Sequence, residues 1–387
     1  MSTTETYKIV ATTLAGLENI LADELKSLNA GEVEILTRAV SFTGNKELMY
    51  KANLWCRTAL KILKPVKYFS IINESDFYNE IYKINWEEYL NVNNTLQIDC
   101  VTNNSIITHS KYAAQKAKDA VVDRFRHKFN KRPSVDLENS TLRINIHLSN
   151  NNCTVSLDSS GDVLYKRGYK IASFEAPINE VLAAGMILLS GWDKKCNFID
   201  PMCGSGTILI ETALIANNIP PGYYRRRFGF EKWKDFDKEL WDEIKKNSLL
   251  EQTEFENKIL GSDISERSIS IAEKNIKYAK LHKDIELNIS SFEDFVPPEE
   301  KGIIITNPPY DERMKKEDIN GFYKSLGDTL KKKYDGYDAW LISSNFEALK
   351  SIGLKTSRKI ALFNGPLECR FVKFEIYKGS KKEVGSE

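Results

Sequence analysis

The stretch Asp200-Pro-Met-Cys-Gly-Ser-Gly-Thr207 lies between an apolar strand predicted at Asn197–Ile199 and a helix predicted at Gly206–Ala216. Glycines at such a turn let the backbone reverse tightly and approach a ligand closely. The free N–H groups at the start of the following helix bind polar or anionic groups. A carboxylate before the turn can bind a ligand amine. The stretch therefore predicts a strand–turn–helix unit with a ligand site at the turn.

The ligand that suits this turn is S-adenosylmethionine, because its methionine part carries a cationic amino group and an anionic carboxylate. A Walker loop would end in Gly-Lys-Ser/Thr, whereas this turn continues as Gly206-Thr207-Ile208, and the dinucleotide fingerprint GxGxxG is absent. An ordinary strand–helix turn is the alternative. The residues predicted to bind the cofactor here are Asp200, Pro201, Met202, Cys203, Gly204, Ser205, Gly206 and Thr207.

Two more carboxylates follow later strands. Asp263, followed by Ile264, ends the strand predicted at Ile259–Ile264, where a carboxylate can accept hydrogen bonds from a ribose diol. The same Asp-Ile-Ser turn is also a common helix cap. Asp294 follows the strand predicted at Ile285–Ile289 and could hold the adenine amino group, although a plain loop carboxylate fits as well. We expect Asp263, Ile264 and Asp294 to line the cofactor site.

The loop Asn307-Pro-Pro-Tyr310 follows a strand predicted at Ile303–Thr306. Its prolines end a central strand, stiffen the loop and remove two donors. The Asn307 side-chain carbonyl and the Pro308 backbone carbonyl can bind both hydrogens of an exocyclic amine on a nucleobase and aim its nitrogen at a methyl carbon. Tyr310 would stack on a base taken out of its helix. Asn307, Pro308, Pro309 and Tyr310 are the predicted catalytic residues, and a rigid turn is the alternative.

Strands and helices alternate from about residue 177 onward, which favours a mainly parallel, doubly wound sheet. Further strands are predicted at Ala339–Ser343, Lys359–Phe363 and Arg370–Tyr377, and helices at Ser268–Lys280 and Phe322–Lys332. The last two strands have no helix between them and predict an antiparallel hairpin at one edge. We expect the tail Gly379–Glu387 to be frayed.

The first 65 residues predict a ferredoxin-like α+β layer. Its strands are expected at Tyr7–Thr12, Val33–Phe42 and Ala59–Lys67, and its helices at Leu17–Leu28 and Lys46–Trp55. The next segment, to about residue 160, is expected to hold strands at Thr95–Thr102, Leu142–Leu148 and Cys153–Leu157, with the last two paired around Asn150–Asn152. A helix is predicted over Ser110–Phe129, with Ala113, Ala117, Val121, Phe125 and Phe129 along one face.

The formal net charge is only +1, so any case for nucleic acid rests on local charge. The helix over 110–129 and the residues after it form one basic patch, and an aromatic stretch over 222–238 forms another. A solvated face is the alternative for each. The predicted RNA-binding residues are Lys111, Lys116, Lys118, Arg124, Arg126, Lys128, Arg132, Arg225, Arg226 and Arg227.

The chain shows no secretory signal and no run of eighteen apolar residues, so neither export nor a membrane span is expected. Its six cysteines are scattered and form no CxxC, so we expect no disulfide framework and no metal site. A reducing cytoplasm fits this composition.

By these residues the chain resembles the class I methyltransferases that act on amino nitrogens, and its N-terminal half resembles the THUMP-containing RNA methyltransferases. The strings that carry this resemblance are Arg132-Pro-Ser-Val-Asp136, Thr154-Val-Ser-Leu-Asp158, Lys166-Arg-Gly-Tyr169, Glu175-Ala-Pro-Ile-Asn-Glu180 and Asn364-Gly-Pro-Leu-Glu368. The resemblance implies a ferredoxin-like domain at 1–66, a THUMP RNA-binding domain at 67–160 and a Rossmann-like methyltransferase domain with a mostly parallel seven-stranded sheet at 161–379.

The resemblance is greatest to the bacterial enzymes that make N2-methylguanosine in 23S rRNA, in a form with one catalytic domain. It implies S-adenosylmethionine as cofactor and, as partner, 23S rRNA or a precursor of the large ribosomal subunit. A tRNA guanine-N2 methyltransferase is an alternative, because THUMP domains also occur in tRNA-modifying enzymes. An adenine-N6 methyltransferase is another, and a non-catalytic RNA-binding protein is a third.

Overall fold

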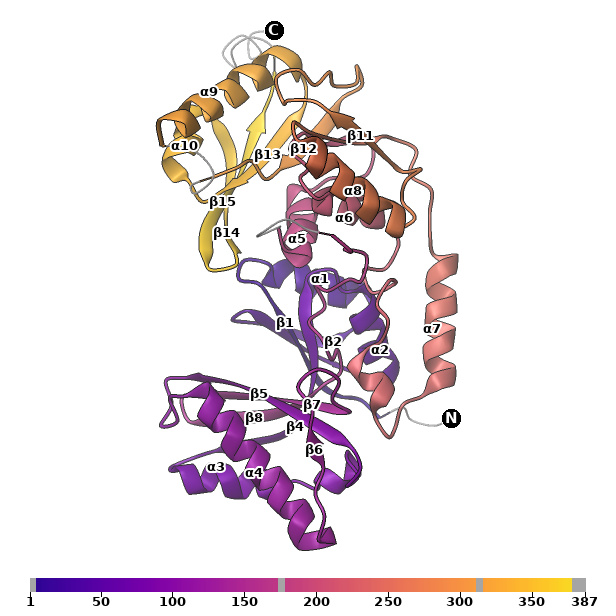
Figure 1. Ribbon diagram of the computed structural model, residues 1–387, viewed down its shortest axis with the longest axis vertical. Coiled ribbons are helices and arrows are strands. Elements are labelled where there is room, and N and C mark those ends of the chain that lie inside the picture. Colours follow the sequence, from indigo (N-terminus) through magenta and orange to yellow (C-terminus); the bar gives the residue numbers. More distant parts are fainter. Residues whose placement is uncertain (1–4, 173–177, 311–315, 378–387) are drawn as a thin grey trace. The chain divides into compact units, whose positions relative to one another are not determined.

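The computed structural model describes residues 5–172, 178–310 and 316–377. The chain divides into two compact units, coloured by sequence in Figure 1. The first comprises Met1–Thr13, Leu21–Leu164 and Arg226–Lys246, and the second comprises Leu14–Ile20, Tyr165–Arg225 and Asn247–Glu387. The tail Gly379–Glu387, expected to be frayed, and the first three residues of the string that begins at Glu175 lie outside the described residues.

The first unit opens with a βαββαβ layer. Its elements are β1 (Tyr7–Thr13), α1 (Glu18–Ser27), β2 (Gly31–Leu36), β3 (Ala39–Gly44), α2 (Lys46–Trp55) and β4 (Ala59–Ser70), with strands in the order β2-β3-β1-β4. The single strand predicted at Val33–Phe42 is wrong, because the chain reverses there and β2 pairs antiparallel with β3. Arg38 adopts a left-handed φ of +55° at this reversal, a conformation unusual for a residue with a side chain.

The same sheet continues into the next segment. The added elements are α3 (Glu74–Tyr82), η1 (Trp86–Glu88), β5 (Thr95–Asn103), α4 (Ser110–Phe129), β6 (Ser134–Val135), β7 (Leu142–Ser149) and β8 (Asn152–Asp158). The long strand β4 pairs with β1 near its start and with β8 over its remainder, so all eight strands form one sheet in the order β2-β3-β1-β4-β8-β7-β5-β6. Helix α4 buries its predicted stripe through Phe125, whereas Phe129 is 44% exposed, so the buried face ends one turn early.

Residues 226–246 belong to the first unit although they are far away in sequence. They contain η2 (Gly229–Lys232) and the start of α7 (Lys238–Leu250). Phe230 stacks on Tyr50 of α2 with ring centroids 4.1 Å apart, and Trp241 meets Phe230 edge-on at 5.1 Å. These aromatic contacts fix the segment to the core of the first unit.

The second unit holds a seven-stranded sheet. Its elements are α5 (Glu180–Ser190), β9 (Asn197–Asp200), α6 (Thr207–Ala216), β10 (Ile259–Asp263), α8 (Glu266–Tyr278), β11 (Ile285–Ile289), β12 (Gly302–Thr306), α9 (Lys316–Lys333), β13 (Asp338–Ser343), α10 (Phe346–Ser351), β14 (Thr356–Asn364) and β15 (Leu367–Glu375). The strand order is β11-β10-β9-β12-β13-β15-β14. Strands β9 to β13 run parallel, and β15 and β14 close the sheet antiparallel. This confirms the predicted parallel sheet with an antiparallel edge hairpin.

Strand β9 lies between β10 and β12, and all three run in the same direction. Their carboxyl ends therefore meet at one edge of the sheet, where open α/β sheets bind ligands. Asp200, Asp263 and Thr306 are the last residues of these strands. Within the described ranges, no helix is long and apolar enough to cross a membrane.

Candidate active site

The turn after β9 has the backbone that its glycines allow. Gly204 has φ +53° and Gly206 has φ +78°, both in the left-handed region, and α6 begins directly afterwards at Thr207. The Gly206 N–H donates to the Cys203 carbonyl at 2.8 Å, and the Cys203 N–H donates to the Ser262 carbonyl at 2.9 Å. A side chain at Gly204 would meet no protein atom within 4 Å. The turn thus presents an open backbone face to a ligand.

Asp200 is buried at the end of β9, with only 1% of its surface exposed. Its Oδ1 atom accepts hydrogen bonds from Thr306 Oγ1 at 2.7 Å and from the Met202 N–H at 3.3 Å. Burial raises the pKa of this carboxyl to about 7, the two hydrogen bonds oppose that rise, and the charge of Asp263 adds to it. The Oδ1 atom accepts both hydrogen bonds, so the Oδ2 atom can accept a hydrogen bond from a ligand. A cationic ligand group there would hold the carboxylate ionised.

Asp263 ties β10 to the turn. Its Oδ2 atom accepts the Gly204 N–H at 3.0 Å, and its Oδ1 atom accepts the Ser265 N–H at 2.9 Å at the start of α8. The structure therefore joins three predicted cofactor residues, Asp200, Gly204 and Asp263, through adjacent strands and the turn. The Ile264 side chain next to them is 76% exposed.

The other predicted cofactor residues differ in their surroundings. Asp294 is exposed in a turn capped by Ser291, whose hydroxyl donates to it at 2.8 Å. No hydrogen bond among the described residues joins Asp294 to the glycine turn. Cys203 is buried, and burial raises the pKa of its thiol, so this residue is neutral and packs as a small apolar side chain.

The loop Asn307–Tyr310, predicted to be catalytic, presents an unpartnered acceptor among the described residues. Asn307 Oδ1 is buried and has no hydrogen-bond partner among the described residues. Buried polar atoms are normally paired, so an unpaired one calls for an explanation such as a missing ligand. Two tyrosines help to fix the loop. Tyr323 donates to the Pro309 carbonyl at 3.4 Å, and the Tyr310 hydroxyl accepts from Asn364 Nδ2 at 2.8 Å.

Two residues that the sequence analysis missed support these loops. Thr306 joins the Asn307–Tyr310 loop to the glycine turn through its hydrogen bond to Asp200. Asn275 of α8 is fully buried, and its amide donates to the carbonyls of Ser205 at 3.1 Å and Ala172 at 2.9 Å. Thr306 precedes the Asn-Pro-Pro-Tyr motif directly, a signal that could have found it, whereas nothing local marks Asn275.

The predicted RNA-binding cations are mostly engaged within the protein. On α4, Lys116 pairs with Glu74 at 2.8 Å and Arg124 with Glu87 at 2.7 Å. The same helix also pairs Lys118 with Asp119, Arg126 with Asp123 and Lys128 with Glu87. Arg225 donates to the Lys166 carbonyl at 2.8 Å. Lys111, Arg132, Arg226 and Arg227 are exposed.

Three families match the chain along its length. The RlmL ferredoxin-like domain matches residues 8–63, the THUMP domain matches residues 72–158, and the RMKL-like methyltransferase domain (UPF0020) matches residues 167–373. A protein of Synechocystis sp. named as a candidate RNA methyltransferase, slr0064, is 38% identical over 97% of this chain and 98% of its own length.

The ribosomal RNA large subunit methyltransferase K/L of Syntrophotalea carbinolica is 38% identical over 95% of this chain and 53% of its own length. The chain thus spans about half the length of this large-subunit relative. The crystal structure of SMU.472, a candidate methyltransferase complexed with SAH, has a TM-score of 0.87 at 29% identity, covering 97% of this chain and 100% of that one.

These matches confirm the predicted ferredoxin-like, THUMP and class I methyltransferase folds and the predicted cofactor, S-adenosylmethionine. The buried carboxylate of Asp200 at the glycine turn fits the amino group of that cofactor. The Asn307 Oδ1 atom, unpaired among the described residues, fits an amine as the group to be methylated. The chain belongs to the THUMP-containing, S-adenosylmethionine-dependent RNA methyltransferases with an RMKL-like catalytic domain.

Proposed function

We propose that this protein methylates the exocyclic N2 of a guanine in 23S rRNA. The observation that carries the proposal is the buried Oδ1 of Asn307, which has no hydrogen-bond partner among the described residues. Asn307 follows Thr306, the last residue of β12, whose hydroxyl donates to Asp200. An acceptor fixed at that point suits a donor-rich amine on a base. The large-subunit methyltransferase relatives support rRNA as the substrate class.

We propose that Asp200 binds the α-amino group of the cofactor, because it is a buried carboxylate that forms no ion pair with a described residue. The N–H groups around Gly204 and the start of α6 suit the cofactor carboxylate. Asp263 would accept from the ribose hydroxyls, and Asp294 would accept from the adenine amine. The residues that would line the rest of the site are Pro201, Met202, Cys203, Ser205, Gly206, Thr207 and Ile264. When bound, the cofactor supplies an electrophilic methyl group on a sulfonium.

The chain's own residues then hold the acceptor. Asn307 Oδ1 and the Pro308 carbonyl would each accept one hydrogen of the target amine, which fixes the nitrogen for in-line attack. Tyr310, held by Asn364, would pack against the face of the base. Pro309, whose carbonyl accepts from Tyr323, keeps the loop in place. The methylated amine is transiently acidic, so its extra proton can leave to solvent without a dedicated base.

The test is a methyl-transfer assay with labelled S-adenosylmethionine, followed by nucleoside analysis. The substrates are 23S rRNA and tRNA from a strain that lacks this protein, together with unmodified genomic DNA. We expect label in N2-methylguanosine from rRNA. The same nucleoside from tRNA only would overturn the rRNA assignment and keep the chemistry, and label in N6-methyladenine would overturn the guanine assignment.

We propose that the predicted cations of the basic patches contact the RNA backbone. The largest share should come from the cations that form no ion pair with a carboxylate of the described residues. The double variant K111A/R132A removes two exposed cations, and K116A/R124A removes two that are paired with glutamates. We expect the first to flatten the plot of log affinity against log salt by about 0.7 per lost contact for single-stranded RNA. A larger change in the second variant would reverse this ranking.

We further propose the domain boundaries 1–66, 67–160 and 161–379 and a cytoplasmic location. Residues 226–246 would then be an insertion of the catalytic domain that packs with the first compact unit. The arginines Arg225, Arg226 and Arg227 would lie where the chain passes from one unit to the other. Limited proteolysis at these positions, with and without RNA, checks this proposal, and protection by RNA is the expected result.

A further inference from the structure

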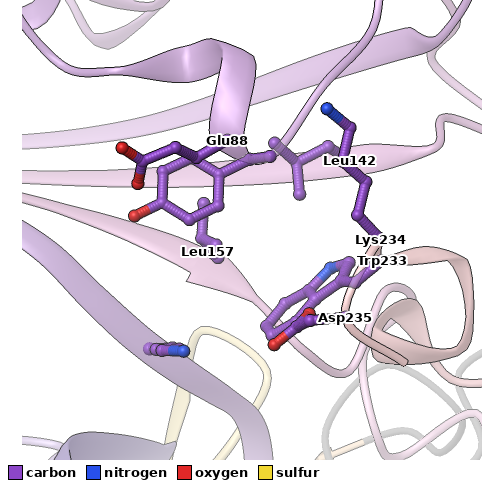
Figure 2. Close-up of a pocket in the computed structure, with 8 residues that line it drawn as sticks. Glu88, Leu142, Leu157, Trp233, Lys234 and Asp235 are labelled. Carbon is purple, nitrogen blue, oxygen red and sulfur yellow. The ribbon is translucent and has the colours of Figure 1, made fainter. Parts of the chain in front are cut away.

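The pocket shown in Figure 2 lies in the first unit, where residues 226–246 join the rest of that unit. Lys234 on its wall donates to the backbone carbonyls of Glu87 at 2.7 Å and Leu90 at 2.9 Å, and the Nε1 atom of Trp233 is buried. The protein itself thus uses the Lys234 ammonium and covers the Trp233 N–H. We therefore assign this pocket to the packing of the two segments and look for substrate contacts in the second unit.

The turn between β14 and β15 lies at the same edge of the second sheet as the proposed site. Strand β15 runs antiparallel to β13, and its residue Arg370 pairs with Ser343, the last residue of β13. A parallel strand would bring only its carboxyl end to this edge, whereas an antiparallel hairpin brings a whole turn. The hairpin of β14 and β15, yellow in Figure 1, therefore places residues 364–367 at the edge where β12 ends and Asn307 follows.

This hairpin turn, residues 364–367, has a constrained backbone. Asn364 pairs with Leu367 in the register of the two strands, so only Gly365 and Pro366 lie between them. Gly365 has φ +60°, as the first central residue of a two-residue hairpin turn often has, and the ring of Pro366 fixes the next φ. The side chain of Asn364 therefore starts from a well-defined point of the backbone.

The Asn364 side chain reaches the loop that is predicted to be catalytic. Its Nδ2 atom donates to the Tyr310 hydroxyl at 2.8 Å, across 54 residues of sequence. Both residues are half-buried, and partial removal from water strengthens such a bond. The hydroxyl is the atom of tyrosine furthest from the backbone, so a bond there fixes the direction in which the ring points.

The backbone before Tyr310 has separate support. Tyr323 of α9 donates to the Pro309 carbonyl at 3.4 Å and shares a 2.8 Å hydrogen bond with the hydroxyl of Ser343. Tyr323 and Ser343 are both fully buried. The path of the loop therefore depends on α9 and β13, and the contribution of Asn364 is the position of the Tyr310 side chain.

We propose that Asn364 is a positioning residue for methyl transfer, which holds the Tyr310 ring where that ring packs against the target base. A base that tilts with a loose ring would move its amine away from the Asn307 and Pro308 oxygens and out of line with the methyl group. The hairpin turn thus positions the substrate in addition to closing the sheet. The inference rests on the proposed function, because it takes Tyr310 as the residue that packs against the base.

The test is a double-mutant cycle on methyl transfer, measured at saturating cofactor on the RNA that the wild type labels most. Asn364→Ala removes the amide, Tyr310→Phe removes the hydroxyl and keeps the ring, and a third protein carries both changes. We expect each single change to lower kcat about two- to tenfold, the range for one hydrogen bond. The double variant should be no slower than the slower single variant, because both changes remove the same bond.

The cycle separates positioning from a general effect on the fold. If Asn364→Ala lowers kcat by the same factor in the wild type and in the Tyr310→Phe background, Asn364 acts elsewhere and the proposal is overturned. Leu367→Ala is the matched control in the same turn, because Leu367 is exposed and pairs with Asn364, and its kcat should stay near the wild-type value. An equal loss in Leu367→Ala, or an equal loss of affinity for S-adenosylhomocysteine in Asn364→Ala, also overturns the proposal.

Tyr310→Phe alone decides the case in which Asn364→Ala does not fold, because it leaves the hairpin unchanged. A folded Tyr310→Phe protein with the wild-type kcat overturns the proposal. The nucleoside that the wild type labels tests the proposed function separately. Label in tRNA or in N6-methyladenine refutes that function, and the cycle on that substrate still decides the role of Asn364. Additive effects with label in N2-methylguanosine of rRNA refute the role of Asn364 alone, and a wild type that methylates none of the substrates refutes both.

Discussion

Replacing Thr306 by valine should shift the pH at which this enzyme binds its cofactor. The Thr306 hydroxyl donates to Asp200 Oδ1 at 2.7 Å, and this bond stabilises the ionised carboxylate. A hydrogen bond to a charged group contributes about 1.5–3 kcal/mol, and 1.36 kcal/mol corresponds to one pH unit. Valine has nearly the same shape and no donor, so the pKa of Asp200 should rise from about 7 by about 1–2 units.

The sign follows from which form binds the cofactor ammonium. The ionised carboxylate attracts a cation and the protonated acid does not, so affinity should rise with pH through the pKa of Asp200, near 7 in the wild type. With the pKa raised, the ionised fraction at pH 7 falls from about one half to about 1–10%. The apparent affinity of the variant at pH 7 should therefore be about five- to fiftyfold weaker, and the deficit should shrink as the pH increases.

The assay is calorimetric titration with S-adenosylhomocysteine, which lacks the reactive sulfonium, between pH 5.5 and 8.5. The ratio of the variant's Kd to the wild-type Kd is the readout, because ionisation of the ligand cancels in it. Thr306→Ser keeps the hydroxyl and is the matched control, with a ratio near 1 throughout. A ratio for Thr306→Val that is the same at every pH would refute the reasoning, because it would mean that the variant damages the site without changing the charge of Asp200.

Three further predictions test other parts of the second unit. Asn307→Ala should lower kcat by about 10²–10³ through loss of an acceptor for the target amine while cofactor affinity by calorimetry stays near normal, and equal losses in both would exclude that role. Gly204→Ala and Gly191→Ala place a side chain at φ +53° and +75°, each with no atom within 4 Å, so both should lose about 1–2 kcal/mol in denaturant unfolding. Only Gly204→Ala should also lose cofactor affinity, and a similar loss for Gly191→Ala would point to a general effect of stability. Glu211→Gln removes the negative charge that lies 3.3 Å from the buried Arg167 guanidinium and should cost about 3–5 kcal/mol of unfolding free energy, and a cost under 1 kcal/mol would show that this ion pair contributes little to stability.

The catalytic sheet and its two loops could be predicted because their signals are local. Short apolar strands that alternate with helices specify a parallel sheet, and the glycine turn and the double proline each follow a strand directly. Helix α5 was missed for a physical reason. Its first eight residues, Glu180–Ile187, are all buried, so its sequence has no polar face and no helical period. The β2–β3 reversal was missed because Arg38, rather than a glycine or asparagine, adopts the left-handed turn conformation.

The hydrogen bonds that hold the site together join residues far apart in the sequence, so no local sequence pattern predicts them. Asn275 holds the Ser205 carbonyl from 70 residues away, and Thr306 reaches Asp200 across 106 residues. The stacking of Phe230 on Tyr50 is of the same kind, because an aromatic residue in a basic stretch is equally compatible with an exposed surface. Sequence reasoning therefore finds which residues carry chemistry more readily than it finds which residues hold them in place.

The order of strands gives the site a property that its separate motifs do not have. Because β9 and β12 are neighbours, the last residue of β12 can donate to the last residue of β9. Thr306 therefore affects the charge of the carboxylate proposed to bind the cofactor, and its backbone also carries Asn307, the proposed acceptor for the target amine. A cation that holds Asp200 ionised strengthens its hydrogen bond to Thr306, since bonds to charged groups are the stronger ones. Cofactor binding should therefore reduce the motion of the carboxyl end of β12, which precedes Asn307. Asn307 would then be held in position to accept the amine of the target base.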